Sequence, residues 1–452
     1  MVFMAPPPPE SLKEDKNETG FFASAERTQS QRYLRCDVSL LPFDVYELRF
    51  GHIVPAALGA EIEVSEFIAN SGAWASVACY GVAALGCLYA LFAVWAIRGF
   101  VGSAAAPSLT HYPAVTILKP LHGAEPGLYA NLAGFCVQNY PSPVQIVFGV
   151  DDPEDPAIGV VRNLIADFPA CDLKLVINPR RHGENRKVSN LINMLAEARH
   201  QVLVVSDSDI VVKSDYLEEV VANLERPGVG VVTCLYHGTP AAGFWAELGA
   251  AAINYHFLPG VLTGLKLGLA APAFGSTIAL RRMTLAMIGG FEAIVDQLAD
   301  DHVLGALVRD EGLTVAIPNR TVAHVCAERS AWRLFQQDLR WARTVRSVDP
   351  LGYVGTVITH PVPLAFLGLL LGGLNSNCLI LVLALACRFA LQSELDRTFS
   401  LRGDGFWLGP LRDVLSFAVF IASFFGRGIE WRGRRYSVQA DNSLAYYGEV
   451  EP

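Results

Sequence analysis

The sequence predicts an α/β domain with a mostly parallel, doubly wound sheet, inserted between an N-terminal transmembrane helix and C-terminal transmembrane or interfacial helices. Composition is the first reason: 52% of the 452 residues are hydrophobic and only 17% are charged, whereas soluble domains usually carry about 25% charged residues. The second reason is a middle region in which short β-branched runs alternate with helical patterns, as in βαβ units.

Charge and cysteine content exclude some classes of function. The net charge of −9 offers no basic face for nucleic acid. The nine cysteines include no CxxC pair and no spacing typical of metal ligands. We therefore expect reduced thiols and no structural zinc site.

The N-terminal region is predicted to be an extension followed by one membrane-spanning helix. Residues 1–72 begin with a polar, proline-rich stretch and are expected to be disordered or poorly structured. Residues 73–97 carry no charge, and a helix of this length, at about 1.5 Å per residue, spans the hydrocarbon core of about 30 Å. Arg98 follows directly, so the positive-inside rule places the next domain in the cytoplasm.

Residues 110–350 have the pattern of the α/β domain. Apolar, β-branched runs predict strands at 115–118, 144–150, 173–177, 202–205 and 229–233. Ligands bind at the carboxyl ends of strands in such sheets. Asp151-Asp152 and Asp207 each follow a predicted strand at that end. The apolar stretch 244–269 is predicted to lie either on the membrane surface or in the domain core.

The C-terminal third, residues 354–426, is predicted to form transmembrane or re-entrant helices. Its apolar blocks lie at about 354–371, 378–391 and 414–425, and the last two are short for a full span. The basic and then polar tail, 427–452, favours the cytoplasmic side. One of the three blocks is therefore expected to be re-entrant or interfacial.

The chemistry of the domain is predicted to centre on Asp207-Ser208-Asp209, which has the DxD form. Two carboxylates in alternation after a buried strand can hold a divalent cation, with one of them turned towards a ribose. The cation neutralises a departing diphosphate. A lone DxD is more often a solvated turn, but the unbroken apolar strand that precedes this one favours the cation site.

Two further acidic pairs have both a functional and a structural explanation. Asp151-Asp152 can accept hydrogen bonds from a nucleotide, and it can equally form a turn, which the following Asp-Pro pairs favour. Asp300-Asp301 precedes a helical pattern, where an acid can be an N-cap or a general base for an acceptor hydroxyl. The place of Asp301 after the other acidic clusters favours the base.

Cationic side chains are predicted at the phosphate end of the site. Gln337 and Arg340 share one face of a helix, where Arg340 can clamp a pyrophosphate and Trp341 can line an acceptor channel. The same helix can instead place its cations against lipid phosphates, and both explanations stay open. Lys119 ends the first strand and Lys187 opens a helix, so both are candidate ligands of a nucleotide sugar.

The ordered set of motifs resembles the ceramide glucosyltransferase family, glycosyltransferase family 21, over about residues 73–438. The resemblance rests on Leu118-Lys119-Pro120-Leu121-x-Gly123, Asn139-Tyr140-Pro141, Asp152-x-x-Asp155-Pro156-Ala157, Lys187-x-x-Asn190-Leu191, Ser206-Asp207-Ser208-Asp209-Ile210, Asp300-Asp301, Gln337-x-x-Arg340-Trp341 and Trp431-Arg432-x-Arg434-Arg435-Tyr436. Within the family, the phrases at 188–194, 231–236 and 342–348 are most similar to the bacterial branch that glycosylates hopanoids.

The resemblance implies a GT-A-like cytoplasmic domain with a Rossmann-like, mostly parallel sheet, and an inverting reaction that uses a UDP-sugar with Mg²⁺ or Mn²⁺. It also implies residue roles: a nucleotide-side acid (Asp152), metal and ribose acids (Asp207 and Asp209), a base (Asp301) and a signature helix (Gln337, Arg340 and Trp341). Animal relatives tend to have Gly where this chain has Asp209, so which carboxylate of the DxD binds the metal stays open.

These inferences predict an enzyme that transfers a single sugar from UDP-N-acetylglucosamine or UDP-glucose to the hydroxyl of a membrane lipid. The expected acceptor is a hopanoid, bacteriohopanetetrol, and the alternative is ceramide. The expected location is the bacterial inner membrane, with several crossings and a cytoplasmic catalytic domain. Two other classes stay open: a processive polysaccharide synthase, which also uses a QxxRW helix, and a non-catalytic membrane scaffold.

Overall fold

The structure is a computed structural model, and it describes residues 53–102, 108–372, 378–401, 407–431, 434–439 and 443–449, without the side chains of 53–70. The chain divides into two units, residues 1–62 and 63–452. The predicted N-terminal extension lies outside the described residues as far as residue 52. From residue 53 the chain is helical. The helix α1 (Ile53–Val101) thus begins within the predicted extension, ahead of the predicted apolar segment.

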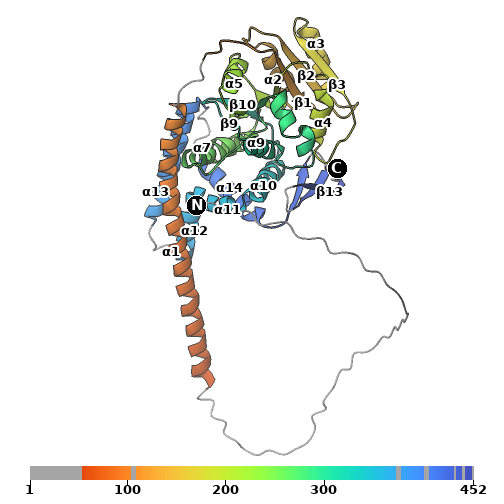
Figure 1. The fold of residues 1–452 in the computed structure, drawn as a ribbon. Coiled ribbons are helices and arrows are strands. Elements are labelled where there is room, and N and C mark those ends of the chain that lie inside the picture. The colour runs from red at the N-terminus through yellow and green to blue at the C-terminus, as the bar shows by residue number, and fades with distance from the viewer. Residues whose placement is uncertain are drawn as a thin grey trace, which may run out of the picture. The chain divides into compact units, whose positions relative to one another are not determined.

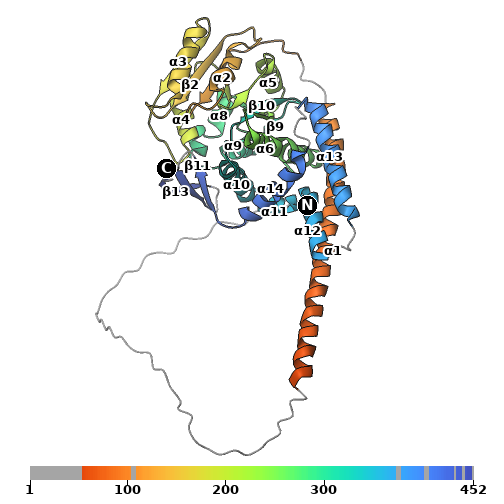
Figure 2. The same ribbon diagram turned by 180° about the vertical axis from the view of Figure 1, so that it is seen from behind.

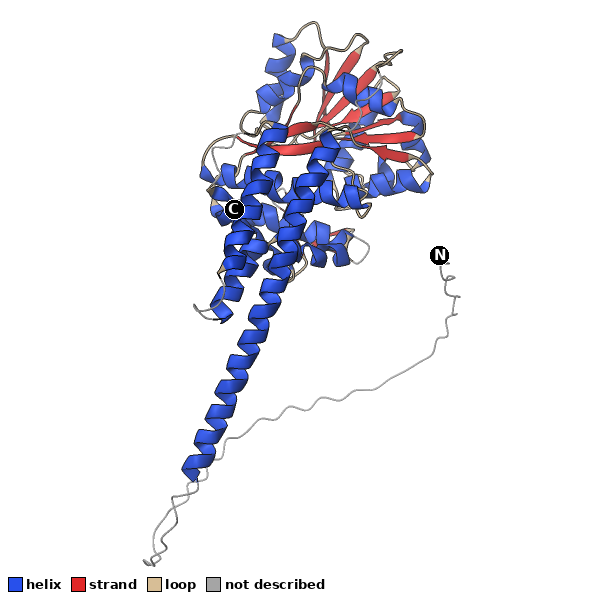
Figure 3. Ribbon diagram, turned by 90° about the vertical axis from the view of Figure 1, so that its left-hand side faces the viewer, coloured by secondary structure: helices blue, strands red, loops and turns tan. Residues whose placement is uncertain are grey.

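A seven-stranded sheet forms the centre of the second unit (Figures 1 and 3). Its strands are β1 (Val115–Pro120), β2 (Val144–Val150), β3 (Asp172–Ile177), β4 (Val202–Val205), β6 (Val229–Thr233), β8 (Ile278–Arg281) and β9 (Thr314–Ala316). They lie in the order β3-β2-β1-β4-β8-β6-β9, and β8 runs antiparallel to both of its neighbours. The other strand pairs in this sheet are parallel, so the prediction of a mostly parallel sheet is confirmed.

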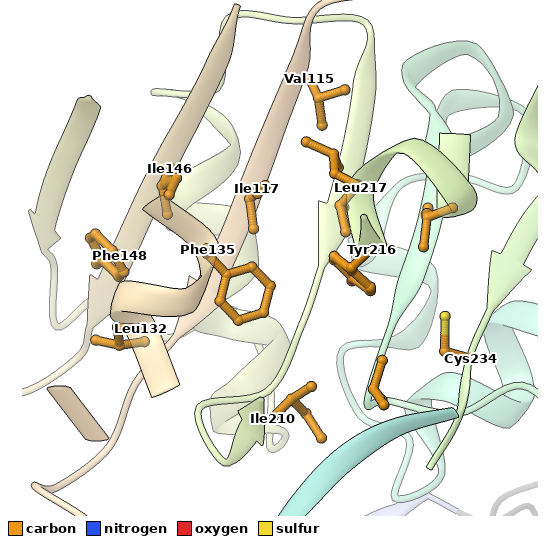
Figure 4. Close-up of a cluster of buried hydrophobic side chains, with 14 of the residues drawn as sticks. Val115, Ile117, Leu132, Phe135, Ile146, Phe148, Ile210, Tyr216, Leu217 and Cys234 are labelled. Atoms are coloured by element: carbon orange, nitrogen blue, oxygen red, sulfur yellow. The ribbon is translucent and has the colours of Figure 1, made fainter. Parts of the chain in front are cut away.

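Helices cover both faces of this sheet because successive strand residues point to opposite sides. Ile117 belongs to a buried cluster with α2 (Leu128–Cys136), α3 (Ala157–Asp167) and α5 (Tyr216–Leu224). Its neighbour Leu118 belongs to a second cluster, with α4 (Arg186–Leu195), α8 (Arg282–Met287), η2 (Phe291–Ile294) and α9 (Asp300–Asp310). Figure 4 shows the first cluster, in which Phe135 and Tyr216 meet edge to face at 5.7 Å.

A smaller sheet lies beside the carboxyl end of β4. It consists of β5 (Ile210–Val211), β10 (Thr321–Cys326) and β7 (Leu235–Pro240), in that order. The apolar stretch after β7 forms α6 (Phe244–Ala252), the π-helix η1 (Ile253–Phe257) and α7 (Leu258–Leu267). Most of these helical residues are buried, which favours the core explanation for this stretch. Leu267 and Leu269 at its end are exposed.

The C-terminal helices differ from the predicted apolar blocks. They are α10 (Ala331–Val348), α11 (Pro350–Gly355), η3 (Thr356–Thr359), α12 (Pro361–Gly372), α13 (Leu379–Phe399) and α14 (Leu408–Ser423). Figures 1 and 2 show α13 alongside α1, where Arg98 pairs with Glu394 at 2.7 Å. Inside the predicted block 378–391, Arg388 of α13 is buried and donates to Asp413 of α14 at 2.8 Å. Paired charges of this kind interrupt the apolar sequence, so neither α13 nor α14 is uniformly apolar.

One described helix is long and apolar enough to cross a membrane, the segment Ser71–Val101 of α1, with a mean hydropathy of 2.1. It contains the predicted span 73–97. The segments 350–359 and 361–372 pass the same test only when joined, and they are bent by 70°. A helix pair bent in this way is either one broken span or a re-entrant loop, so the re-entrant element stays a prediction.

The basic and then polar tail contains a third sheet, which the sequence analysis did not predict. Its strands are β11 (Gly428–Trp431), β12 (Arg434–Val438) and β13 (Leu444–Glu449). Leu298 packs into its core with Tyr436 and Leu444, and the N–H of Leu444 donates to the carbonyl of Asp296 at 2.8 Å. The C-terminal sheet therefore supports the segment that leads into α9.

A buried ion pair holds α10 against α14. Oδ2 of Asp338 accepts from Nη2 of Arg412 at 2.7 Å, and both side chains are almost fully buried. Arg412 also donates to Ser416 at 3.0 Å and to the carbonyl of Leu248 at 3.4 Å. The position of α10 thus depends on a paired charge that water cannot reach.

Replacing Asp338 by Ala should therefore lower the free energy of unfolding by about 3–5 kcal/mol, because Arg412 stays buried without its partner. The change is measured as a lower thermal unfolding temperature of the protein in detergent. The double variant Asp338→Leu/Arg412→Met removes both charges and should recover most of the loss. Equal unfolding temperatures for Asp338→Ala and the wild type would contradict the prediction.

Candidate active site

A buried lysine joins the end of β1 to the loop after β4. Lys119 is fully buried, and its Nζ donates to the carbonyl oxygen of Asp207 at 2.5 Å and to Oγ of Ser206 at 3.3 Å. The ammonium also lies 3.9 Å from the centroid of the Phe135 ring. Burial lowers the pKa of Lys119 to about 7, although Asp207 and Asp209 act in the opposite direction. Lys119 thereby holds the backbone of the loop that carries both acids of the DxD.

Three carboxylates surround Lys187 at the start of α4. Its Nζ lies 2.7 Å from Oδ1 of Asp207 and 3.8 Å from Oδ2 of Asp300. Burial favours the neutral amine, but Asp207, Asp300 and Asp301 together outweigh it and raise the pKa of Lys187. Burial also raises the pKa of Asp300 to about 6 and raises the pKa of Asp301, and Lys187 opposes both shifts. The structure thus gathers Lys187, Asp207 and Asp301 into one charged cluster.

Gly275 lies inside this cluster. Its N–H donates to Oδ2 of Asp301 at 2.8 Å, and Oδ1 of Asp301 accepts from the N–H of His302 at 2.7 Å. Backbone donors therefore hold both carboxylate oxygens of Asp301. A Cβ atom at position 275 would lie 2.9 Å from Nζ of Lys187, 3.1 Å from Oδ2 of Asp207 and 3.5 Å from Oδ2 of Asp301. Only glycine leaves the charged side chains where they are.

Replacing Gly275 by Ala should lower the rate of the predicted sugar transfer about 100-fold, because displacements near 1 Å at a reacting centre have effects of this size. The measurement is kcat with a saturating donor. Gly159 in α3 provides the matched control, since a Cβ added there meets nothing within 4 Å. Gly159→Ala should keep full activity, and an equal loss in both variants would contradict the role of Gly275.

Asp209, the second acid of the DxD, faces a histidine of the small sheet. Ile210 pairs with His324 across β5 and β10, and Nδ1 of His324 lies 3.6 Å from Oδ2 of Asp209. The imidazole packs against the rings of Tyr236 and Trp341, at centroid distances of 5.6 and 6.0 Å. Trp341 of α10 therefore reaches the DxD loop through His324.

The other two residues of the QxxRW motif lie together on α10. Nη2 of Arg340 donates to Oε1 of Gln337 at 3.0 Å, which confirms that they share one face of the helix. Arg340 also lines a cavity of about 270 Å³ between α10 and the C-terminal sheet, with Trp332, Glu430 and Tyr447 among the other lining residues. The motif thus connects the DxD loop on one side with this cavity on the other.

Of the neighbouring acids Asp151 and Asp152, the structure buries the first. Oδ2 of Asp151 accepts from Nε of Arg186 at 2.8 Å and lies 3.5 Å from Nη2 of Arg181. Asp152 is exposed, and its Oδ1 accepts from the backbone N–H of Glu154 at 2.9 Å. Asp152 therefore forms a turn, which is the structural explanation that the sequence offers for the pair Asp151-Asp152. Its contact with a nucleotide stays a prediction.

The donor set suits a divalent cation that is completed by substrate oxygens. Among the described residues, no three His, Cys, Asp or Glu side chains converge closely enough to hold a metal ion by themselves. Mg²⁺ is commonly bound by one or two carboxylates together with substrate phosphates and water. Asp207 and Asp209 can supply such carboxylates, although Oδ1 of Asp207 is already paired with Lys187.

Tyr236 and His324 are site residues that the sequence did not indicate. Both lie on strands of the small sheet, whose pairing depends on contacts distant in sequence. Burial raises the pKa of Tyr236, and the charges of Asp301, Asp209 and Asp207 raise it further. The one signal available in advance is a histidine within the otherwise apolar run Thr321–Cys326.

Comparison with known proteins gives a family for the chain. The family model described as Glycosyl transferase family 21 matches residues 78–444. Ceramide glucosyltransferase 1 of Caenorhabditis elegans is 26% identical over 232 residues, 51% of this chain and 49% of that protein. Ceramide glucosyltransferase of Candida albicans is 36% identical over 124 residues, 25% of this chain and 23% of that protein. The chain thus spans about half the length, or less, of these relatives.

Among solved structures, a mannosyltransferase from Pyrobaculum calidifontis, in complex with GDP-Man and Mn²⁺, matches this chain with a TM-score of 0.46 at 19% identity. The match covers 78% of this chain and 99% of the mannosyltransferase. A TM-score at this level does not establish a common fold, so the assignment rests on the sequence. Because the family model covers more than half of the chain, the chain belongs to glycosyl transferase family 21.

Proposed function

We propose that this chain transfers a single sugar from a UDP-sugar to the hydroxyl of a membrane lipid, with inversion at the anomeric carbon. The observation that carries the proposal is the cluster of Asp301, Asp207 and Lys187 around Gly275, in a member of a glycosyltransferase family. A general base, a metal-binding acid and a cation within one cluster are the groups that sugar transfer from a diphosphate requires.

Asp301 is the proposed base, which removes the proton of the acceptor hydroxyl as its oxygen attacks the anomeric carbon. Backbone N–H groups fix the direction of its carboxylate. Burial raises the pKa of Asp301, and a base whose pKa is nearer to the working pH accepts a proton more readily. The proton thus passes from the acceptor to Asp301 while the bond between the sugar and UDP breaks.

The remaining groups are proposed to neutralise and hold the nucleotide. A divalent cation, Mg²⁺ or Mn²⁺, on Asp209 or Asp207 would stabilise the negative charge of departing UDP. Lys187 and Lys119 supply positive charge beside the same loop. Asp152, at the end of β2, is proposed to contact the nucleoside. Arg340 is proposed to contact the pyrophosphate, and its bond to Gln337 orients it. Trp341 is proposed to border the path of the acceptor.

The acceptor is proposed to be a lipid that reaches the site from a bilayer. The ceramide glucosyltransferase relatives favour ceramide, the alternative acceptor, over a hopanoid, and bacteriohopanetetrol stays the second candidate. The helix Ser71–Val101 supports attachment to a membrane. A bacterial inner membrane with the catalytic domain in the cytoplasm, and more than one crossing, remains part of this proposal.

The test is UDP release by the purified full-length protein with Mn²⁺ or Mg²⁺, with lipid products identified by mass spectrometry. UDP-glucose and UDP-N-acetylglucosamine are each combined with ceramide and with bacteriohopanetetrol. A singly glycosylated lipid is the expected product, and its mass identifies donor and acceptor. Polymer formation would contradict single transfer, and UDP binding without any glycosylated product would favour a non-catalytic scaffold.

A further inference from the structure

We propose that Asn185 is a positioning residue for sugar transfer, because it fixes the start of α4 relative to the start of α9. The inference rests on the proposed function, in which Asp301 is the base and Lys187 supplies positive charge beside the DxD loop. Asn185 lies two positions before Lys187. Its side chain bonds Gln297, which lies three positions before Asp300. The cation and the acids of α9 thus belong to two helices whose starts are connected through Asn185.

The first observation is that the backbone and the side chain of Asn185 both bond the segment ahead of α9. Asn185 is fully buried. Its backbone N–H donates to the carbonyl of Val295 at 2.8 Å, and its Nδ2 donates to the carbonyl of Gln297 at 2.8 Å. Its Oδ1 accepts from the N–H of Val188 at 3.1 Å, which makes Asn185 the N-cap of α4. One buried residue thus joins the first turn of α4 to a segment 112 positions further along the chain.

The second observation is that the C-terminal sheet holds the same segment. Gln297 forms an antiparallel bridge with Ser443, and Leu298 packs into the core of this sheet. The N–H of Glu184, in the loop before α4, donates to Oδ1 of Asp296 at 2.8 Å. The segment is therefore attached to the C-terminal sheet and to the loop before α4 at once, and it cannot shift along its own direction without breaking these bonds.

Apolar packing alone does not fix the polar groups of the two helices. Residues of α4 and α9 belong to the same buried apolar cluster, and apolar contact is not directional. Nζ of Lys187 lies 2.7 Å from Oδ1 of Asp207 but 3.8 Å from Oδ2 of Asp300, so a small movement of α4 against α9 changes which acids the cation balances. Hydrogen bonds have preferred directions and lengths, and Asn185 supplies two of them between the helices.

The alternative explanation is that Asn185 acts only as the N-cap of α4. Serine caps a helix about as well as asparagine, because its hydroxyl also accepts from a backbone N–H in the first turn. A serine side chain has one polar atom where asparagine has two, so it cannot hold both the N–H of Val188 and the carbonyl of Gln297 at their present places. Asn185→Ser therefore keeps the cap and removes the side-chain bond to the segment ahead of α9, whereas Asn185→Ala removes both.

The experiment compares the wild type, Asn185→Ser and Asn185→Ala as full chains in detergent. UDP release with saturating lipid gives kcat and the KM for the donor, and thermal unfolding gives stability. Because a misplacement of 1 Å lowers a rate by as much as about 100-fold, we expect kcat to fall by about 10–100-fold in both variants, with a smaller change in KM. The unfolding temperature of Asn185→Ser should fall by only a few degrees, as the loss of one buried hydrogen bond implies.

Asn223→Ser is the matched control. Asn223 is 4% exposed, and its Nδ2 donates to the carbonyl of Glu219 at 2.9 Å within α5. The helix α5 packs in the other buried cluster of the sheet, away from α4 and α9. This variant loses a bond of the same kind and should lose a similar amount of stability, but it should keep full kcat.

Hydrogen exchange, followed by mass spectrometry, gives a measurement that needs no turnover. In Asn185→Ser, the backbone amides between Asp296 and the first turn of α9 should exchange faster, while those in the first turn of α4 keep their protection. In Asn185→Ala, both regions should exchange faster. In Asn223→Ser, neither region should change.

Full kcat in Asn185→Ser, with a loss confined to Asn185→Ala, would show that the residue is only a helix cap and would overturn the proposal. Equal losses of kcat in Asn185→Ser and Asn223→Ser would overturn it as well. If Asn185→Ala fails to fold, Asn185→Ser alone decides. The two proposals fail separately: a wild type that glycosylates no lipid contradicts the proposed function, whereas an active enzyme with unchanged kcat and exchange in Asn185→Ser contradicts the positioning role alone.

Discussion

Asp301→Asn is expected to lower kcat by about 10²–10⁴-fold, the usual contribution of a general base, while UDP binding is retained. The amide has nearly the shape of the carboxylate, and its single oxygen can still accept one of the two N–H bonds that Gly275 and His302 donate. It cannot take a proton from the acceptor. The measurements are the rate of UDP release with saturating lipid and donor, and the affinity for UDP by calorimetry.

The neighbouring residue supplies the control. Asp300→Asn removes a charge 3.8 Å from Lys187 without altering the carboxylate that Gly275 holds, so its loss of kcat should be much smaller. A loss of UDP binding in Asp301→Asn would show that Asp301 belongs to the nucleotide site, and the assignment as base would be wrong. Equal losses in both variants would also contradict it.

The wild-type enzyme should lose activity with falling pH at a higher pH than an ordinary aspartate would give. Burial raises the pKa of Asp301 and raises that of Asp300 to about 6, and a base must be deprotonated to act. Activity is therefore present above the raised pKa and is lost as the pH falls through it. Because the two carboxyl groups interact, the midpoint belongs to the pair and not to either residue.

Much of the fold could be predicted because its signals are local. The run Val202–Val205 is apolar and β-branched and forms β4, and the acids that follow it lie at the carboxyl end of the sheet. Topology then brings Asp207 and Asp301 together although they lie 94 positions apart in the sequence. The ordered motifs predicted that meeting through the family resemblance, since no spacing in the sequence encodes it.

The rest depended on contacts distant in sequence. Asp151 and Asp152 are adjacent acids, and burial of the first is decided by Arg186 on α4. His324 becomes a site residue only because β10 pairs with β5. The C-terminal sheet has short strands whose core is completed by Leu298, far upstream, so its apolar pattern was too weak to predict strands. The apolar block around Arg388 is interrupted by a charge that is paired across two helices.

Lys187→Met is expected to lower the free energy of unfolding by about 3–5 kcal/mol, the usual cost of breaking a buried ion pair. The cation lies beside Asp207 and Asp300, and its side chain and that of Asp300 are only 11% and 14% exposed. Without it, Asp207, Asp300 and Asp301 repel one another, and Asp300 has little access to water. Thermal unfolding in detergent measures the loss.

The control is a lysine with a similar partner on the surface. Nζ of Lys174 lies 3.0 Å from Oε2 of Glu197, but these side chains are 50% and 45% exposed, so Lys174→Met should cost at most about 1 kcal/mol. A similar loss in both variants would show that the loss in Lys187→Met does not come from the buried charges.

The dependence of stability on pH distinguishes the loss of the Lys187 charge from a loss of packing. The pKa of Lys187 is raised, so its contribution to stability is complete throughout the neutral range and is lost only as the pH rises above about 10. In Lys187→Met the cation that opposes the raised pKa values of Asp300 and Asp301 is gone, and protonation of these groups relieves their repulsion. The difference in unfolding temperature between wild type and variant should therefore be largest at neutral pH and narrow on acidification, whereas a loss of packing alone would give a difference independent of pH.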